Sequence, residues 1–479
     1  DGMVIKYDAE GEAEWAKEIG GEDEDDINSV ARCSDGGYIV GGYFRSSNID
    51  LGNGVSLTNK GSKDGMIIKY NVSGEVEWAQ VIGGTKPDYI ESVVESRDGG
   101  YIVGGEFASK SIDLGKGITL VNKGNLDGMI IKYSTSGEVE WAQGIGGTSG
   151  DQINSVVGTI DGGYIVGGYF ESSSIDLGNG ISLANNGSID GMLIKYGSSG
   201  EVEWTKGIGG TSYDYITSVS ETTDGGYIVG GYFESSSIDL GNGINLVNSG
   251  FYDGMVIKYD SSGEVEWAKG IGGTANDQIT SVVETTDGGY IVGGYFYSDS
   301  IDLGNGRCLV SIQASTLSRY SDGMVIKYGS TGEVEWAHEI GESLYDYVES
   351  VAETIDGGYI VGGYFNSSNI DLGNGVVLIN EGNLSTDGMI IKYSSSGEVE
   401  WGKRIGGMGG DQINSVVETT DGGYIVGGYF ESSSIDLGNG RCLVSIQAST
   451  LSRYRDGMVL KITDQMGVPE IQELEVENK

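Results

Sequence analysis

Short apolar runs separated by glycine-bearing turns make up the chain, and residues 151–208 illustrate the pattern. Four runs predict β-strands, over 151–159, 163–172, 190–196 and 201–208. The turns at 161–163 and 197–200 are short and contain glycine, which is typical of β-hairpins. Apolar side chains occupy both odd and even positions in the runs, as expected of strands that are covered on both faces. No segment shows convincing helical periodicity.

The same unit is repeated seven times. Tryptophan recurs at Trp15, Trp78, Trp141, Trp204, Trp267, Trp336 and Trp401, and an Asp-Gly-Gly turn recurs with it. Residues 151–180 and 411–440 differ at only two positions, where Gly158 and Ile160 correspond to Glu418 and Thr420. Repeated four-stranded units with fixed aromatic and glycine positions are typical of β-propellers. We therefore predict an all-β, seven-bladed β-propeller of four-stranded antiparallel blades over residues 1–465.

The order of the strand motifs predicts how the ring closes. The strand that begins Asp-Gly-Met occurs eight times, whereas the other three occur seven times. The chain begins with the third and fourth strands of a unit (1–18) and ends with the first three (411–462). We expect one blade to combine N- and C-terminal strands, which leaves either 1–7 or 456–462 in surplus. Residues 466–479 depart from the repeat and are expected to be a linker toward a further domain.

Two repeated features predict contacts between blades. The tryptophan of the fourth strand is expected to pack against the neighbouring blade. A Gly-Gly pair lies inside the second strand, as at Gly167-Gly168. Glycine weakens a strand, and it often marks a position that another group approaches closely. We expect aromatic side chains of the neighbouring blade to make that approach.

Composition narrows the classes of function. The formal charge is −43 and no basic stripe interrupts it, so the surface repels phosphate backbones and nucleic-acid binding is not expected. No apolar run approaches the length of a membrane helix, so the chain is not expected to be embedded in a membrane. The three cysteines form no disulfide framework. We expect a monomeric module within a larger protein.

An aspartate opens the first strand of every unit and is the candidate metal ligand. If this strand is innermost, these carboxylates lie around the mouth of the central channel, and oxygen-rich clusters suit Ca²⁺. The alternative is that each aspartate caps its own turn by accepting main-chain N–H groups. The residues are Asp25, Asp88, Asp151, Asp214, Asp277, Asp346 and Asp411.

One sequence breaks the regularity of the repeat. RCLVSIQASTLSRY occurs at 307–320 and again at 441–454, in place of the Asn- and Gly-rich connection between the second and third strands. Its arginines are candidate ligand-binding residues for a protein or glycan, and the alternative is a loop exchange that spread by recombination between repeats. They are Arg307, Arg319, Arg441, Arg453 and the adjacent Arg455. Ligand binding is expected on the face that carries these connections and those between the fourth and first strands.

Catalysis requires an asymmetric set of groups, and near-identical blades supply the same groups seven times. His338, the single histidine, lies on an outer strand. We therefore expect a non-catalytic binding or scaffolding module and no enzyme. A glycoside hydrolase or lyase that uses a carboxylate pair, and a rigid spacer, remain the alternatives.

The repeat also resembles a known family. Residues 253–273 (DGMVIKYDSSGEVEWAKGIGG) and 277–296 (DQITSVVETTDGGYIVGGYF) resemble the bacterial β-propeller repeat called the SBBP repeat, and the likeness extends through essentially the whole chain. A weaker likeness is to kelch repeats. The SBBP resemblance implies a propeller fold and an extracellular or bacterial cell-surface location, and hardly any chemistry.

Overall fold

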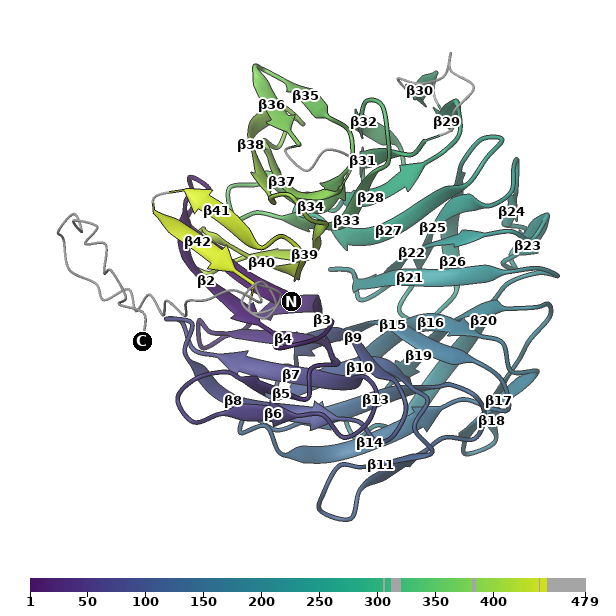
Figure 1. Ribbon diagram of the computed structural model, residues 1–479. Helices are drawn as coiled ribbons and strands as arrows, with labels where there is room; N and C mark the ends of the chain where they lie inside the picture. Colours follow the sequence, from purple (N-terminus) through teal and green to yellow (C-terminus); the bar gives the residue numbers. More distant parts are fainter. Residues whose placement is uncertain (305, 312–319, 381–384, 439, 446–479) are drawn as a thin grey trace, which may run out of the picture.

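The computed structural model describes residues 1–304, 306–311, 320–380, 385–438 and 440–445. They form seven four-stranded antiparallel sheets arranged as the blades of a ring (Figure 1). This confirms the predicted seven-bladed propeller. The predicted linker (466–479) and the eighth Asp-Gly-Met strand (456–462) lie outside the described residues.

Six blades run from the channel outward in the order of the chain, and the seventh takes its two outer strands from the N-terminus. The innermost strands are β3 (Asp25–Arg32), β9 (Asp88–Glu95), β15 (Asp151–Gly158), β21 (Asp214–Glu221), β27 (Asp277–Glu284), β33 (Asp346–Glu353) and β39 (Asp411–Glu418). The second strands are β4 (Tyr38–Phe44), β10 (Tyr101–Phe107), β16 (Tyr164–Phe170), β22 (Tyr227–Phe233), β28 (Tyr290–Phe296), β34 (Tyr359–Phe365) and β40 (Tyr424–Phe430).

The outer half of each blade completes the sheet. The third strands are β7 (Asp64–Tyr70), β13 (Asp127–Tyr133), β19 (Asp190–Tyr196), β25 (Asp253–Tyr259), β31 (Asp322–Tyr328), β37 (Asp387–Tyr393) and β1 (Gly2–Tyr7). The outermost strands are β8 (Val76–Ile82), β14 (Val139–Ile145), β20 (Val202–Ile208), β26 (Val265–Ile271), β32 (Val334–Ile340), β38 (Val399–Ile405) and β2 (Ala13–Ile19).

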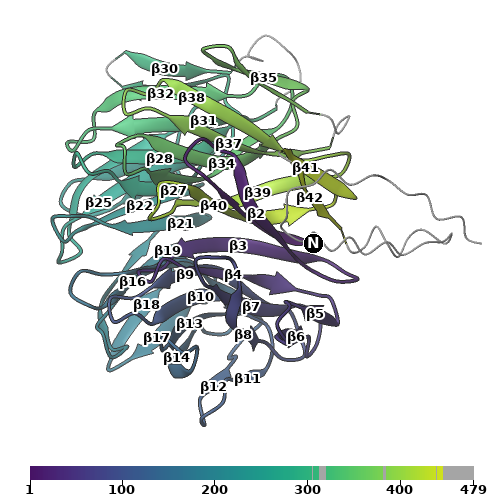
Figure 2. The same cartoon turned by 90° about the vertical axis from the view of Figure 1, so that its left-hand side faces the viewer.

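The seventh blade closes the ring by joining the two ends of the chain. Its strand order is β2-β1-β40-β39, with Tyr7 opposite Tyr424 and Gly2 opposite Tyr429. The N-terminal strands lie beside the C-terminal ones in both ribbon views (Figures 1 and 2). The predicted closure is confirmed, and within the described residues the N-terminal copy of the third strand, β1, fills the position.

The connections between second and third strands differ from the sequence prediction. No strand was predicted there, but each connection contains a short antiparallel hairpin. The hairpins are β5–β6 (Asn48–Asp50, Ser56–Thr58), β11–β12 (Ser111–Asp113, Thr119–Val121), β17–β18 (Ser174–Gly178, Ile181–Ala184), β23–β24 (Ser237–Asp239, Asn245–Val247), β29–β30 (Ser300–Gly304, Arg307–Val310), β35–β36 (Asn369–Gly373, Val376–Ile379) and β41–β42 (Ser434–Gly438, Arg441–Val444). One apolar residue on each strand, such as Ile175 and Leu183, is buried. The hairpins contact the outermost strands, as β18 contacts β20.

Aromatic and aliphatic contacts join neighbouring blades. Trp141 of β14 packs against Tyr164 of the next blade with ring centroids 5.9 Å apart, which confirms the predicted role of the tryptophans. The expectation for the Gly-Gly pair was wrong. A Cβ on Gly167 would lie 2.6 Å from Val219 of the next blade, and one on Gly168 would lie 2.0 Å from the carbonyl oxygen of Gln152. Aliphatic side chains and the blade's own main chain, rather than aromatic rings, require the glycines.

Candidate functional site

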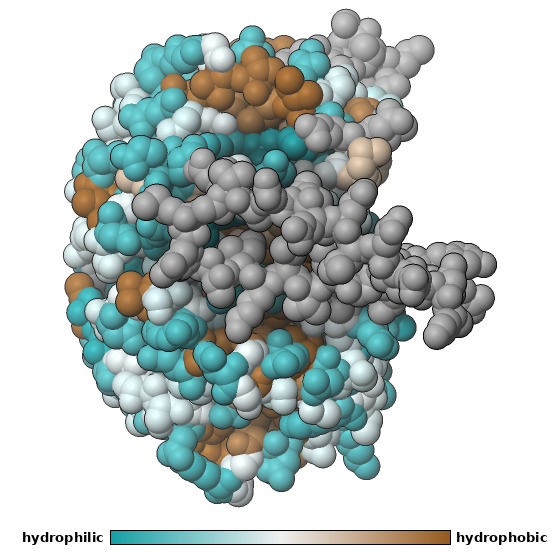
Figure 3. Space-filling model, turned by 60° about the vertical axis from the view of Figure 1, so that its left-hand side comes forward, coloured by the Kyte–Doolittle hydropathy of each residue, from teal (hydrophilic) through white to brown (hydrophobic). Residues whose placement is uncertain are grey.

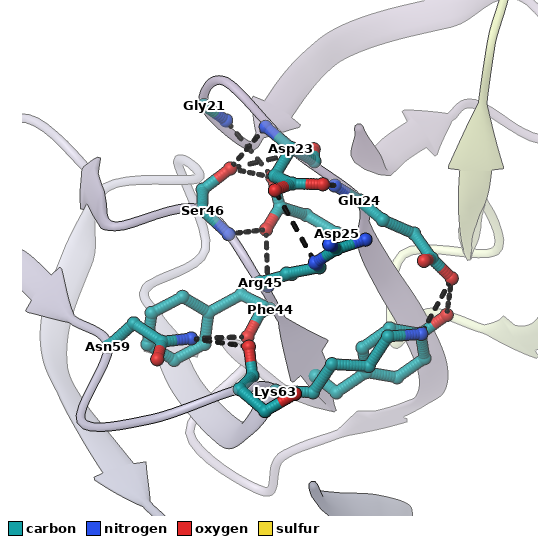
Figure 4. A network of polar contacts seen from close by, with 11 residues as sticks. Gly21, Asp23, Glu24, Asp25, Phe44, Arg45, Ser46, Asn59 and Lys63 are labelled. Atoms are coloured by element: carbon teal, nitrogen blue, oxygen red, sulfur yellow. Dashed lines mark hydrogen bonds and ion pairs between the residues drawn. The ribbon is translucent and has the colours of Figure 1, made fainter. Parts of the chain in front are cut away.

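The seven aspartates that open the innermost strands are buried hydrogen-bond acceptors. Asp25 accepts the main-chain N–H groups of Gly21, Arg45 and Ser46, and the Ser46 hydroxyl at 2.6 Å (Figure 4). The same serine contact, 2.5–2.7 Å long, recurs in every blade. Each carboxylate therefore ties the start of its strand to the connection that leaves the second strand, as the capping alternative predicts.

These aspartates do not gather into one cluster. Among the described residues, no group of three or more His, Cys, Asp and Glu side chains is placed to hold a metal ion. Burial raises the pKa of Asp88 to about 6 and that of Asp346 to about 7, against the hydrogen bonds that lower them. The Ca²⁺ site therefore stays a prediction from the sequence.

The arginines of the repeated RCLV sequence lie at the outer rim. Arg307 begins β30 and Arg441 begins β42, and both side chains are exposed. The two hairpins belong to the fifth and seventh blades, on either side of the sixth. Arg319, Arg453 and Arg455 lie outside the described residues. Cys308 and Cys442, in the same hairpins, are free and exposed.

A ring of polar and aromatic residues lies at the channel mouth, and sequence reasoning did not single it out. It consists of the second residue of each innermost strand and the sixth residue of each second strand, which pair across the sheet in every blade. The pairs, in chain order, are Asp26–Tyr43, Tyr89–Glu106, Gln152–Tyr169, Tyr215–Tyr232, Gln278–Tyr295, Tyr347–Tyr364 and Gln412–Tyr429. We call these fourteen residues the mouth ring.

The tyrosines of the mouth ring touch one another within and between blades. Tyr215 stacks on Tyr232 at 4.7 Å, and it also meets Tyr169 of the preceding blade at 4.9 Å. Tyr347 contacts Tyr295 edge-on at 4.5 Å, and its hydroxyl is 2.7 Å from that of Tyr297. Alternation along the innermost strands could have revealed this set, because the position after each aspartate is aromatic, amide or acidic in every unit.

Two carboxylates, Glu91 and Glu106, lie on the two inner strands of the second blade. Glu106 takes the place of a tyrosine in the mouth ring, is 9% exposed, and its Oε2 has no hydrogen-bond partner within the described structure. Glu91 lies two residues beyond Tyr89 on β9. Burial raises the pKa of Glu106 to about 8, with a further contribution from Glu91, whose own pKa burial raises to about 7.

Two cavities open at the mouth ring. One, of about 670 Å³, lies between the seventh and first blades and is lined by Asp23, Glu24, Asp26, Tyr43, Tyr429 and Glu431, among others. The other, of about 230 Å³, is lined by Tyr213, Tyr215, Tyr232, Glu234 and Tyr252 of the fourth blade and by Gln278 of the fifth. In the view of Figure 3 the surface is mostly hydrophilic, with a few separate hydrophobic patches.

Comparison with known proteins supports the repeat and the fold. The chain is 22% identical over 94% of its length to an uncharacterized WD repeat-containing protein (L264) of Acanthamoeba polyphaga mimivirus, and 24% identical over 74% of its length to the regulatory protein FlaEY of Caulobacter vibrioides. It spans 38% of each of these relatives. No family model matches the chain, so the expected SBBP membership is not supported. The chain is a β-propeller repeat protein.

Solved structures resemble the chain only loosely. Sqt1 from Chaetomium thermophilum matches 84% of this chain and 78% of its own at 10% identity, with a TM-score of 0.39. A protein of unknown function from Bacteroides caccae matches 71% of this chain and 93% of its own at 12% identity, with a TM-score of 0.35. These scores do not extend a function to this chain. The described part of the chain has no helix long and apolar enough to cross a membrane.

Proposed function

We propose that this protein is a non-catalytic binding module that holds a protein ligand at the mouth ring. The observation that supports the proposal is the concentration of nine tyrosines of the ring at one end of the channel, on the face where the innermost strands begin. Tyrosine offers a large contact area and a hydroxyl at low cost in side-chain entropy, and it is enriched at protein interfaces. A rigid scaffold that presents such residues suits recognition.

The test compares one substitution on each face of the ring. Tyr347→Gln places in the sixth blade the residue that the third, fifth and seventh units have there, so the fold is expected to tolerate it. Val72→Ala alters a side chain that is 60% exposed in the turn between the outer strands β7 and β8, on the opposite face of the ring. Ligands are first selected on a peptide, protein and glycan array. Tyr347→Gln is expected to weaken ligand binding about tenfold, and Val72→Ala to leave it unchanged.

Three results would count against this proposal. An array without any ligand would favour the rigid spacer. A glycan as the only ligand would replace the protein partner. Binding that Val72→Ala weakens and Tyr347→Gln does not would move the site to the opposite face.

The carboxylate pair favours a second candidate function, a glycoside hydrolase or lyase. Glu91 and Glu106 lie on the two inner strands of one blade, and burial raises the pKa of both. Glycoside hydrolysis requires two carboxyl groups, one on either side of the scissile bond. Turnover of polysaccharides that is lost in Glu106→Tyr, which restores the residue of the other six units, would support it. A wild type that turns over none of them leaves the binding module as the better proposal.

An extracellular or cell-surface location is part of the proposal and rests on the resemblance of the repeat alone. Antibody labelling of intact source cells is expected to match that of permeabilised cells. Labelling only after permeabilisation would place the protein inside the cell.

A further inference from the structure

The cavity in the fourth blade is walled by aromatic rings and one carboxylate. Tyr215 and Tyr232 come from β21 and β22, whereas Tyr213 and Tyr252 lie just before β21 and β25. The centroid of Tyr232 is 4.7 Å from that of Tyr215 and 5.3 Å from that of Tyr252. Four rings around about 230 Å³ leave room for a small group that favours π-faces.

Glu234 supplies a negative charge at the rim of this cavity. Its Oε2 accepts the Ser212 hydroxyl at 2.6 Å, which orients the carboxylate while leaving further lone pairs available. The residues that line the cavity include no lysine or arginine. Tyr213 is 47% exposed, so the cavity is open to solvent on that side.

The first blade shows what occupies the corresponding place there. Lys63 Nζ lies 4.4 Å from the centroid of Tyr43 and 5.7 Å from that of Tyr89, and it pairs with Glu24 at 2.8 Å. Figure 4 shows this lysine reaching across the blade toward Glu24. The protein thus already holds one ammonium group between tyrosine rings and a carboxylate.

Alignment of the repeats shows that the fourth blade lacks this internal cation. Tyr252 stands at the position of Lys63, and Glu234 stands at the position of Arg45. Tyr232 corresponds to Tyr43. The two cationic positions of the first blade have therefore become an aromatic wall and an acid, around an open cavity.

We propose that the cage formed by Tyr213, Tyr215, Tyr232, Tyr252 and Glu234 binds the ammonium group of a lysine side chain on the protein partner. This assignment rests on the function proposed above and names the chemistry that the partner presents. A cation over tyrosine faces is attracted by the ring quadrupoles, and more strongly when it is partly desolvated. The net charge of −43 attracts basic partners to the same molecule. A compact ammonium suits a cage with one carboxylate, whereas a guanidinium favours two parallel hydrogen bonds to a carboxylate.

The experiment titrates a defined probe, the peptide acetyl-Gly-Gly-Lys-Gly-Gly-amide, into the full chain and follows binding by calorimetry. Tyr213→Asn removes one wall and introduces the residue of the fifth unit, Asn276. Tyr345→Asn is the matched control, because Tyr345 occupies the same repeat position in the sixth unit and is 40% exposed. Tyr252→Lys imitates the first blade and should fill the cage with an internal ammonium.

We expect Tyr213→Asn and Tyr252→Lys each to weaken peptide binding about tenfold, and Tyr345→Asn to leave it unchanged. Equal affinities in the wild type and all three variants would overturn the assignment, because they would indicate diffuse attraction to the acidic surface. Binding of tetramethylammonium or an arginine peptide in place of the lysine peptide would overturn the choice of lysine. If array ligands respond to Tyr347→Gln while no lysine peptide binds, the mouth ring remains the binding site and only the cage assignment fails.

Discussion

A buried lysine in the third strand links three elements of every blade. Lys195 Nζ lies 2.8 Å from Asp161 and 3.2 Å from Glu203, and it donates to the carbonyl oxygen of Tyr196. Lys6, Lys69, Lys132, Lys258, Lys327 and Lys392 make corresponding ion pairs. The lysines are almost fully buried while their partners remain about half exposed. Each ammonium group therefore depends on these carboxylates to offset the cost of its burial.

Lys195→Met is expected to lower the free energy of unfolding by about 2 kcal/mol, because it removes a buried charged donor with three acceptors. The measurement is urea denaturation followed by tryptophan fluorescence. Lys206→Met is the control, since Lys206 is one-third exposed and pairs with the exposed Glu264. A change below about 0.5 kcal/mol is expected there. Equal losses in the two variants would contradict the structural role of Lys195.

Glu349 interrupts a line of hydrogen bonds between innermost strands. At the equivalent positions Asn154 and Thr217 donate to main-chain carbonyl groups of the next blade, which an ionised carboxylate cannot do. Burial raises the pKa of Glu349 to about 7. Since this value lies above that of an unfolded glutamate, the folded protein binds the proton more tightly, and stability is lost as the pH rises from about 4 to about 7.

Glu349→Gln should remove that loss. At pH 8 we expect the variant to be more stable than the wild type by about 1 kcal/mol, and at pH 4 to be equally stable. Urea denaturation at both pH values measures the difference. A difference that is the same at the two pH values would show that Glu349 does not titrate as described.

At the scale of the element, the turn between the third and fourth strands is shaped by the preceding blade. Gly200 has a φ of +85°, and a Cβ there would lie 3.1 Å from the Trp141 ring. Gly162, in the turn between β15 and β16, has the same φ, but a Cβ would meet nothing within 4 Å. Substitutions at these two glycines therefore distinguish two contributions to the free energy of unfolding, the strain of a left-handed backbone and the steric clash with Trp141.

Gly162→Ala is expected to cost about 1 kcal/mol through the backbone alone, and Gly200→Ala about 2 kcal/mol because the Trp141 contact is added. Denaturation curves of the two variants and the wild type give both values. If Gly162→Ala costs as much as Gly200→Ala, the glycine–tryptophan contact contributes nothing.

At the scale of the whole molecule, the junctions between blades are not equivalent. Glu221 at the end of β21 accepts the main-chain N–H of Ile160 in the preceding blade at 2.7 Å, and Glu284 accepts that of Thr223. Glu95, Glu353 and Glu418 make the same contact. Gly158 and Arg32 stand at this position at the remaining two junctions, so these lack the carboxylate.

Gly158→Glu is expected to stabilise the ring by about 1 kcal/mol, because it supplies the missing acceptor between the second and third blades. Gly158→Ala provides the control, since it gains backbone rigidity without a carboxylate. Thermal and urea denaturation measure both. An equal gain from alanine would assign the whole effect to the backbone.

The seven capping aspartates predict how the molecule responds to chelation. Their carboxylates already accept donors within the protein, so EDTA is expected to leave the Tm unchanged. Differential scanning calorimetry with EDTA and with added Ca²⁺ tests this. A fall of several degrees with EDTA that Ca²⁺ restores would establish the calcium site that the sequence suggested.

The sequence by itself determined the number of blades, the strand order and the closure of the ring. The reason is that the strands of one blade are close together in the sequence and the unit is repeated. Turn glycines and strand patterns therefore specify every blade in the same way. Tertiary structure alone decided how the repeated positions meet. The hairpin at the rim, the aliphatic approach to Gly167 and the mouth ring all join residues from different strands or blades.

The candidate site shows the same division. The binding face predicted from the sequence stays a prediction, and the residues of the mouth ring were not among those it named. The aspartates were candidate ligands or caps in the sequence, and the serine hydroxyls that they accept, 21 residues away, are seen only in the folded structure. The tyrosine cage is visible only after folding, because Tyr213, Tyr232 and Tyr252 reach one cavity from separate connections and strands. The repeated residues specify the ring. The residues that differ between repeats form a candidate site only where the folded ring places them side by side.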